Sequence, residues 1–423
     1  MARINVKFAD NDWEQQYRGQ GSRYFVQVPP NKVYYFFIDF EWNLTLARSR
    51  NNGLTWDEPI RLAINNLSDI YQYSIWYDSW SDINSNLIHI IYVTNAYDYF
   101  YINYNVSTET ISSPVTVVNY PYSTFNPISF TGLSITRAKG GNLGIYYSND
   151  YIYSGFAKSS NTGSAWANVT SSQQGSPNAP ERENIYLLPE LSSDDPQDMV
   201  AFTLLNPAAT YPYIFKKFYD NSLNTWFTSS FGSGSYNNVG QNIGIPWLAA
   251  FPDLVNSQSV LIGWNTSGYP FTALTAQLRC YTITSASTTT KTSVIASSGA
   301  GSYGQGPCGL TWNRDDNAWY AFYGGKSTGG EDVNTMNIYY KKSTDQGTTW
   351  SSETRFTSDL PTFLNTQSFG LVEMVVPPII SGSDNMVIFM GNSSLSPISP
   401  QGDINPLYIN TFLPTAGGSI VVT

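Results

Sequence analysis

Five carboxylates of this sequence could do chemistry, because an enzyme that cleaves a glycosidic bond needs only two Asp or Glu side chains on facing elements. They are Asp39, Asp78, Glu190, Asp253 and Glu373. The sequence does not show that any two of them face each other across a cleft. Asp and Glu at strand ends also serve as turn residues. A glycoside hydrolase or lyase with a carboxylate pair is therefore the alternative prediction.

Other kinds of catalytic centre lack suitable residues. His89 is the sole histidine and lies inside an apolar run, where we expect a packed side chain. This argues against Ser-His-Asp and Cys-His mechanisms and against a histidine-based metal site. Cys280 and Cys308 fit no metal-ligand spacing, and they either form one disulfide or remain buried thiols. We predict no catalytic residue, no metal and no cofactor.

The composition limits the partners of the chain. Only 12% of its 423 residues are charged, the net charge is −10, and no basic run is present. A phosphate backbone would be repelled, so we predict no nucleic acid partner. The N-terminus has no apolar signal-peptide core, and no apolar stretch of 18 residues or so exists to enter a membrane. Aromatic residues make up 15% of the chain, which favours β structure.

A strand-like run of six residues returns at a nearly constant spacing of 54 to 67 residues. Its seven copies begin at Val33, Leu87, Leu143, Met199, Val260, Trp319 and Met386. Each copy is one of about four short β-patterned runs separated by turn residues. A unit of four antiparallel strands with this period is typical of a propeller blade.

We therefore predict an all-β fold, a seven-bladed β-propeller of four-stranded antiparallel blades, with residues 1–423 forming a single domain. The approximate blades are residues 22–66, 72–120, 128–175, 183–232, 244–297, 305–358 and 367–423. The last strand is either residues 418–423 or residues 3–9, and the latter would close the ring with the N-terminus. The alternative is a six-bladed propeller with an appended hairpin.

An octet recurs between the third and fourth strand of several units. Its defining positions are Ser343, Asp345, Gly347 and Trp350 in STDQGTTW; Ser49, Asn51, Gly53 and Trp56 in SRNNGLTW; and Ser159, Asn161, Gly163 and Trp166 in SSNTGSAW. A shortened copy runs from Asp220 to Trp226. Asp or Asn can bond backbone amides ahead of it, and Gly supplies a positive φ. We interpret the octet as a structural corner of each blade.

Through these octets and their placement, the chain resembles the sialidase-like, Asp-box (BNR-repeat) β-propeller superfamily. The resemblance implies three arginines that hold a substrate carboxylate, a Tyr-Glu nucleophile pair and an Asp acid/base. The position of the first arginine corresponds here to Gln27, and the neighbouring Arg23 lies four residues away. Glutamine cannot form the bidentate, charge-assisted pair of an arginine with a carboxylate. The chain is therefore expected to be a non-catalytic member.

A ligand site is expected at the central channel, which the innermost strands of a propeller line. Charged or polar residues end most of these strands, and tryptophans lie beside them. The predicted ligand-binding residues are Gln27, Trp76, Asp78, Arg137, Glu190, Asp253, Trp312, Arg314 and Glu373. Aromatic rings stack on sugar faces while charged groups bind sugar hydroxyls, so this set favours carbohydrate.

The function expected from the sequence is non-catalytic surface recognition. The surface composition combined with the missing signal peptide indicates a structural protein of a virion or particle that binds a host glycan or glycoprotein. Its localisation would be a virion or cell surface with extracellular exposure, and other virion proteins would be further partners. An intracellular assembly scaffold is a third hypothesis.

Overall fold

The structure is a computed structural model. It describes residues 4–6, 25–28, 30–38, 42–53, 55–62, 70–77, 86–96, 98–118, 133–149, 153–160, 162–169, 181–205, 213–230, 248–253, 257–266, 276–283, 291–297, 308–313, 317–325, 337–356, 373–377, 379–380, 386–391 and 407–412. No helix in these ranges has the length and hydropathy of a membrane span.

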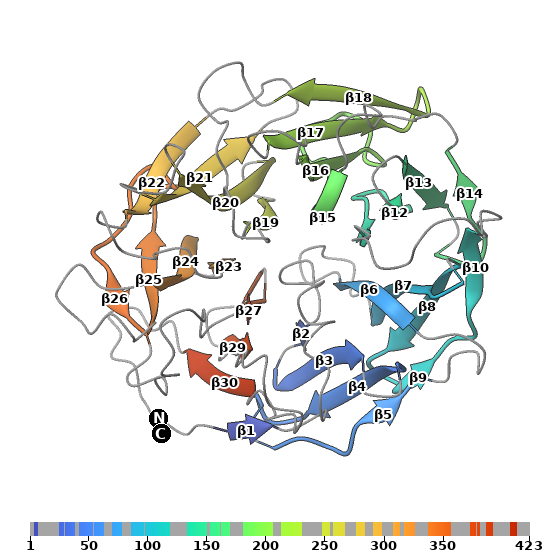
Figure 1. The fold of residues 1–423 in the computed structure, drawn as a ribbon, viewed down its shortest axis with the longest axis horizontal. Helices are drawn as coiled ribbons and strands as arrows, with labels where there is room; N and C mark the ends of the chain where they lie inside the picture. The colour runs from blue at the N-terminus through green and yellow to red at the C-terminus, as the bar shows by residue number, and fades with distance from the viewer. Residues whose placement is uncertain are drawn as a thin grey trace, which may run out of the picture.

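The described strands form seven sheets arranged around one axis (Figure 1). We number these sheets as blades in chain order. Blade 1 has β2 (Phe25–Val28), β3 (Lys32–Ile38), β4 (Leu44–Ser49) and β5 (Ile60–Arg61); blade 2 has β6 (Ile70–Tyr77), β7 (Leu87–Thr94), β8 (Tyr99–Asn105), β9 (Thr110–Ile111) and β10 (Val115–Val118). Blade 3 has β11 (Leu133–Arg137), β12 (Leu143–Asn149), β13 (Tyr153–Ser159) and β14 (Ala167–Asn168).

The second half of the ring repeats the same plan. Blade 4 has β15 (Glu181–Pro189), β16 (Met199–Leu205), β17 (Tyr213–Asp220) and β18 (Thr225–Ser230); blade 5 has β19 (Leu248–Asp253), β20 (Gln258–Thr266), β21 (Ala276–Ile283) and β22 (Lys291–Ser297). Blade 6 has β23 (Cys308–Asn313), β24 (Ala318–Gly325), β25 (Asn337–Ser343), β26 (Thr354–Arg355) and the added β28 (Ile379–Ile380); blade 7 has β27 (Glu373–Val375), β29 (Met386–Gly391), β30 (Leu407–Phe412) and β1 (Ile4–Val6). The prediction of an all-β propeller of four-stranded antiparallel sheets is confirmed.

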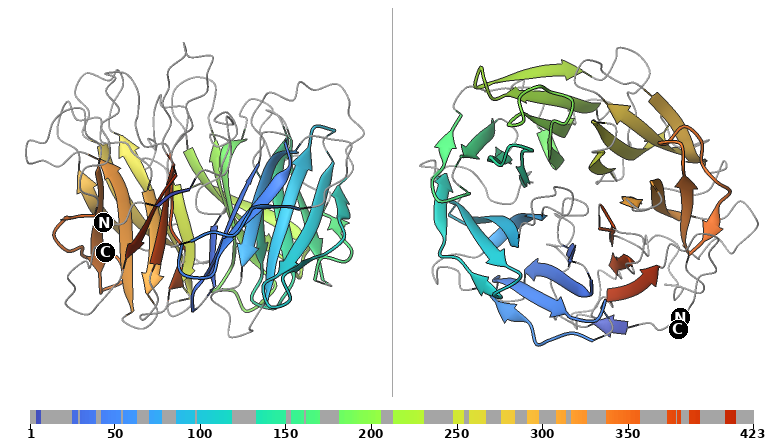
Figure 2. Two further views of the ribbon diagram at one scale, coloured as in Figure 1. Left: turned by 90° about the horizontal axis from the view of Figure 1, so that it is seen from below. Right: turned by 180° about the vertical axis from the view of Figure 1, so that it is seen from behind.

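Within a blade, strands that follow one another in sequence pair antiparallel, and the first strand lies nearest the axis (Figure 1). The strands stand upright along the axis when the ring is seen from its side (Figure 2). The innermost strands from β6 to β23 contact one another in order around the centre. The innermost strands begin 45 to 67 residues apart in sequence, and this arrangement brings them to one central channel.

Blade 7 joins the two halves of the chain. β1 pairs with β30, with Ile4 opposite Ile409 and Val6 opposite Leu407. Of the two candidates for the last strand, residues 3–9 therefore contain the one that completes this sheet, whereas residues 418–423 lie outside the described residues. The unit that the six-blade alternative treats as an appended hairpin is a sheet of β1, β30, β29 and β27.

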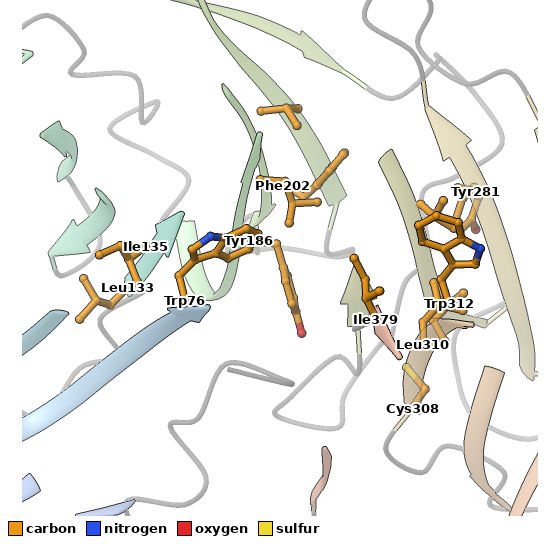
Figure 3. Packing of buried hydrophobic residues seen from close by; sticks show 14 of the residues in the cluster. Trp76, Leu133, Ile135, Tyr186, Phe202, Tyr281, Cys308, Leu310, Trp312 and Ile379 are labelled. Carbon is orange, nitrogen blue, oxygen red and sulfur yellow. The ribbon is translucent and has the colours of Figure 1, made fainter. Parts of the chain in front are cut away.

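The core lies between blades, because side chains on both faces of each sheet pack against the neighbouring sheets. One buried cluster contains residues of blades 2 to 6, and a second is made by blades 1 and 2. Figure 3 shows Trp76, Leu133, Ile135 and Tyr186 from three successive blades pointing toward one another. Each large apolar side chain buried in this way contributes about 1.5–3 kcal/mol. Alternating apolar residues thus stabilise the ring as well as each blade.

Serine hydroxyls also connect successive innermost strands. The backbone N–H of Ile135 in β11 donates to Ser74 Oγ in β6 at 3.4 Å. The N–H of Leu187 in β15 donates to Ser134 Oγ in β11 at 2.9 Å. An innermost strand has a free edge, whose buried backbone donors need partners. These serines supply them from the preceding blade.

The octets form the bonds that the sequence predicts for a corner. The N–H groups of Gly53, Gly163 and Gly347 donate to the first serine of each octet at 2.8, 3.0 and 2.8 Å. All three glycines have positive φ, at 82°, 95° and 74°. Asp345 Oδ1 accepts the N–H of Thr349 at 2.9 Å, and Asn51 Oδ1 accepts that of Thr55 at 2.8 Å. Asn161 lies outside the described residues.

Two octets also fasten one blade to the blade before it. In blade 3, the ring of Tyr101 from β8 packs 5.3 Å from Trp166, and its hydroxyl donates to Thr162 O at 3.2 Å. In blade 6, Trp350 Nε1 donates at 3.0 Å to the hydroxyl of Ser293 from β22, which itself donates to Gly347 O. The octet is therefore an interblade contact in addition to a turn.

Candidate functional site

The candidate residues at the strand ends lie on the same face of the ring as the octets. The first strand of a blade is antiparallel to the second and the second to the third, so the first and third strands end at the same face. The register shows this directly, because Arg137 is opposite Leu143, and Leu143 is opposite Ser159. In blade 1 and blade 6, the same cross-strand pairing places Gln27 level with Ser49 and Trp312 level with Ser343.

The aromatic candidates on this face are part of the core. Trp76 is 7% exposed and Trp312 is 3% exposed. The indole N–H of Trp312 donates to Asn317 Oδ1 at 3.2 Å, and both rings lie within the large buried cluster (Figure 3). Gln27 is also buried. Rings packed in this way offer little surface on which a sugar could stack.

The carboxylate candidates on this face accept hydrogen bonds from nearby residues of the turns that follow them. Glu190 is buried, and its Oε1 accepts the N–H and the hydroxyl of Ser192 at 3.0 and 2.5 Å. Asp253 is also buried, and its Oδ2 accepts Gln258 Nε2 at 2.8 Å. These are the bonds of turn residues, as the sequence allowed. Arg137 is half-buried, and its Nε donates to Gly141 O at 3.4 Å within its own hairpin.

Of the three remaining candidates, the structure describes one, Glu373. Asp78 and Arg314 lie outside the described residues. Glu373 is the first residue of β27 and is opposite Gly391, the last residue of β29. The chain then runs to β28, which pairs with Trp312 and Asn313 of β23 near the octet face. Glu373 therefore lies at the opposite end of the channel, away from Glu190, Asp253 and Arg137.

That opposite end has charged residues that sequence reasoning did not select. β15 begins with Glu181, Arg182, Glu183 and Asn184, and Glu181 is opposite Leu205, the last residue of β16. Two innermost strands, β15 and β27, thus begin with charged residues at this end. The sequence feature that indicates this charged end is the run Glu181-Arg182-Glu183 in a charge-poor chain.

His89 cannot act as a surface acid or base. It is 2% exposed, and its Nδ1 lies 2.7 Å from the hydroxyl of Tyr101. Burial, together with the positive charge of Arg137, lowers the pKa of His89 to about 3. The buried, neutral imidazole is part of the packed core. The apolar run around His89 predicts such a packed side chain.

The acidic residues in the turn between β15 and β16 also form turn contacts. Asp198 is buried and accepts the N–H of Asn221 at 2.8 Å and the hydroxyl of Ser193. Burial raises the pKa of its carboxyl. Asp195 accepts Asn221 Nδ2 at 3.1 Å. Within the described ranges, no three His, Cys, Asp or Glu side chains are arranged to hold a metal ion.

The two cysteines are separate, free thiols, so the disulfide that the sequence left open is not formed. Cys280 in β21 and Cys308 in β23 are both buried. Burial in apolar surroundings raises the pKa of the Cys308 thiol, which keeps it protonated and unreactive.

Comparison with known proteins shows the fold of the chain. No family model and no curated protein match the sequence. An ulvan lyase from a new family of polysaccharide lyases matches with a TM-score of 0.51 at 9% identity, over 98% of this chain and 96% of the other. Polysaccharide lyase Uly1 matches with a TM-score of 0.50 at 10% identity, over 98% and 99%. A mutant of the sialidase NanB from Streptococcus pneumoniae matches at 0.45 and 13% identity, over 97% and 70%. The two lyase matches show that the chain shares their fold.

Proposed function

We propose that this protein is a carbohydrate-binding β-propeller that recognises a polysaccharide without cleaving it. The observation that carries the proposal is the shared fold over nearly the whole length of two polysaccharide lyases. A polysaccharide needs a broad polar surface with hydroxyl and amide groups. The composition of this chain, rich in Tyr, Asn, Ser and Thr and poor in charge, suits such a surface.

The two buried carboxylates at the octet end and the sole histidine favour binding over catalysis. Glu190 and Asp253 are buried, and they accept hydrogen bonds from Ser192 and Gln258, respectively. The sole histidine is neutral in the core. A lyase needs a base that removes a proton from the sugar, and a hydrolase needs two carboxyl groups about 5–10 Å apart across the scissile bond. Neither the histidine nor these two carboxylates are placed for that work.

The net charge of −10 favours a neutral glycan as the ligand. A polyanionic chain would be repelled at long range, and this repulsion would be strongest at low ionic strength. A neutral glycan makes hydrogen bonds to hydroxyl, amide and carboxylate groups and does not require a basic patch. A panel of neutral and anionic polysaccharides therefore separates the two ligand classes.

We place the binding surface at the end of the channel where β15 and β27 begin. The described candidates at the octet end are buried or bonded within turns. At the other end, Glu181, Arg182, Glu183 and Glu373 begin innermost strands. Arg182→Ala is expected to weaken binding of the best glycan at least tenfold in isothermal titration calorimetry. Arg137→Ala is the competing test, because a larger loss there would return the site to the octet end.

Display on a virion or another particle is the localisation that we propose from the composition. Mass spectrometry of purified particles tests it, since the protein should copurify with them in fixed stoichiometry. Recovery only from the soluble fraction of the producing cells would favour the intracellular scaffold.

A further inference from the structure

The outermost strand is short in the three blades that carry a full octet. In the three blades with a full octet, the strand after the octet has two residues: β5, β14 and β26. Blade 4 has the shortened copy and blade 5 has none, and their outer strands β18 and β22 have six and seven residues. Blades 4 and 5 therefore have longer outer edges than the three blades with a full octet.

β18 is an edge strand without the usual protection against pairing. Proteins protect such edges with short strands, charged residues, proline or bulges. The sequence of β18 is TWFTSS, which contains none of these residue types, and its pairing with β17 runs in register from Asp220–Thr225 to Phe215–Ser230. By contrast, β22 begins with Lys291, and its pairing with β21 shifts between Leu278 and Arg279.

Exposed apolar side chains gather on the same hairpin. Leu223 in its turn is 63% exposed and Phe227 is 48% exposed, while Phe227 stacks on Phe218 at 6.5 Å. Among the described residues, the other exposed large hydrophobics are Ile60 and Val294, one each on β5 and β22. On the other face of β18, Trp226 packs against Phe156 at 5.0 Å. One face of β18 thus packs against blade 3, the other face exposes Phe227, and the strand lies at the rim of the ring (Figure 1).

We propose that β18 pairs antiparallel with β18 of a second copy of this chain. In the described part of the sheet, β18 is the terminal strand, so every second residue directs its N–H and C=O away from β17. A two-fold axis brings two identical edges together with matched twist and length. Because the strand is uncharged, no like charges face each other in the paired region.

The symmetry fixes the register of the pair. With the two-fold axis normal to the sheet and between the two copies of Phe227, each Phe227 faces Phe227 of the other copy, and the two blades 4 form one eight-stranded sheet. The turns at Asp220, which carry the nearest negative charges, then lie at opposite ends of the interface. They are separated by roughly the length of the strand, about 20 Å. The net charge of the protein therefore does not oppose this particular contact at physiological salt.

Analytical ultracentrifugation of the full chain tests the proposal. The wild type should show a monomer–dimer equilibrium between about 1 and 100 µM, the range expected for a modest interface. Phe227→Lys puts like charges at the interface and should raise the dimer dissociation constant at least tenfold. Val294→Lys is the matched control, because Val294 is 42% exposed and also lies on an outer strand. Its dissociation constant should equal that of the wild type.

Hydrogen exchange locates the interface. Dilution from the dimer to the monomer should increase exchange at the outward-facing amides of β18 and leave β22 unchanged. A wild type that stays monomeric across this range overturns the proposal. So does a dimer that Phe227→Lys leaves intact, or one that Val294→Lys weakens equally, provided that circular dichroism shows both variants folded.

Discussion

At the scale of single residues, the octet glycines combine an unusual backbone with close packing. Gly347 has a φ of 74°, and a Cβ added there would lie 2.7 Å from Trp319 and 3.1 Å from Cys280. Gly163 has the same conflict with Tyr101. These positions therefore require glycine for two separate reasons, one conformational and one steric.

Gly347→Ala should lower the free energy of unfolding by about 2–4 kcal/mol, since a strained φ costs about 1–3 kcal/mol and overpacking adds to it. Gly141→Ala separates the two causes. Gly141 has a φ of 102°, yet a Cβ there would meet only Arg137 at 3.6 Å. Urea denaturation should give a clearly smaller loss for Gly141→Ala. Equal losses would mean that packing against Trp319 contributes nothing.

His89 should make the protein less stable in mild acid. The folded pKa of about 3 lies below the ordinary value of 6.5, so the unfolded chain takes up a proton that the folded chain refuses. Stability contributed by the neutral imidazole is complete above pH 6.5 and falls as the pH drops toward 3. A difference of one bound proton between the unfolded and folded chains changes the free energy of unfolding by about 1.4 kcal/mol per pH unit.

Denaturant unfolding of the wild type and His89→Phe between pH 6.5 and 5 measures this effect, because most carboxyl groups remain ionised there. The free energy of unfolding should fall with pH more steeply for the wild type than for the variant. The difference in slope should correspond to the uptake of close to one proton on unfolding. Identical slopes would contradict the account of His89.

Residue roles were only partly predictable from the sequence. The octet pattern identified Ser343, Asp345 and Gly347 because their bonds are local, within four residues. The pattern could not reveal that Trp76 and Trp312 are buried, because burial depends on neighbouring blades far away in sequence. Glu373 was assigned to the wrong end of its strand, since the seventh unit has no octet to set its register.

At the scale of elements, the octet is a turn and a link between blades. Asp345 accepts Thr349 N at 2.9 Å, Thr349 Oγ1 at 2.6 Å and Ser343 Oγ at 2.9 Å. These bonds hold the pKa of its carboxyl down at about 2. The stabilisation from the charged form is therefore present at neutral pH and lost only as the pH falls toward 2.

Asp345→Ala should lower the free energy of unfolding by about 1–2 kcal/mol, the cost of losing a capping side chain. Asp345→Asn should cost less than about 0.5 kcal/mol, because Asn51 makes the corresponding bonds to Thr55 and Ser49 in blade 1. Guanidinium denaturation at pH 7 compares the two variants. If Asn proves as damaging as Ala, the carboxylate charge and not the bond geometry holds the turn.

The sequence predicted elements well wherever strands alternate strictly and turns carry octets. It did not predict β28, a two-residue strand that pairs parallel with β23. Such a contact depends on how blade 7 docks on blade 6, where Val376 packs against Gly309. No local pattern encodes it. The length of the outer strands β18 and β22 becomes predictable only when short strands are known to follow the full octets.

At the scale of the whole molecule, the ring is closed by β1 pairing with β30. Deletion of residues 1–7 should open blade 7 and lower the apparent melting temperature by several degrees, as expected for a loss of about 1–2 kcal/mol in a large domain. Deletion of residues 418–423 should change it little. Differential scanning calorimetry compares the two truncations, and the reverse order would assign closure to the C-terminus.

The central claim is that the protein binds a polysaccharide and leaves it intact. The most direct measurement is a polysaccharide array read for binding, with mass spectrometry and ultraviolet absorbance of each bound polysaccharide after incubation with the protein. The account predicts saturable binding of a neutral glycan with no shortened chains and no unsaturated product. Release of either product would contradict it and establish a hydrolase or a lyase, and the absence of binding across the array would remove the carbohydrate function altogether.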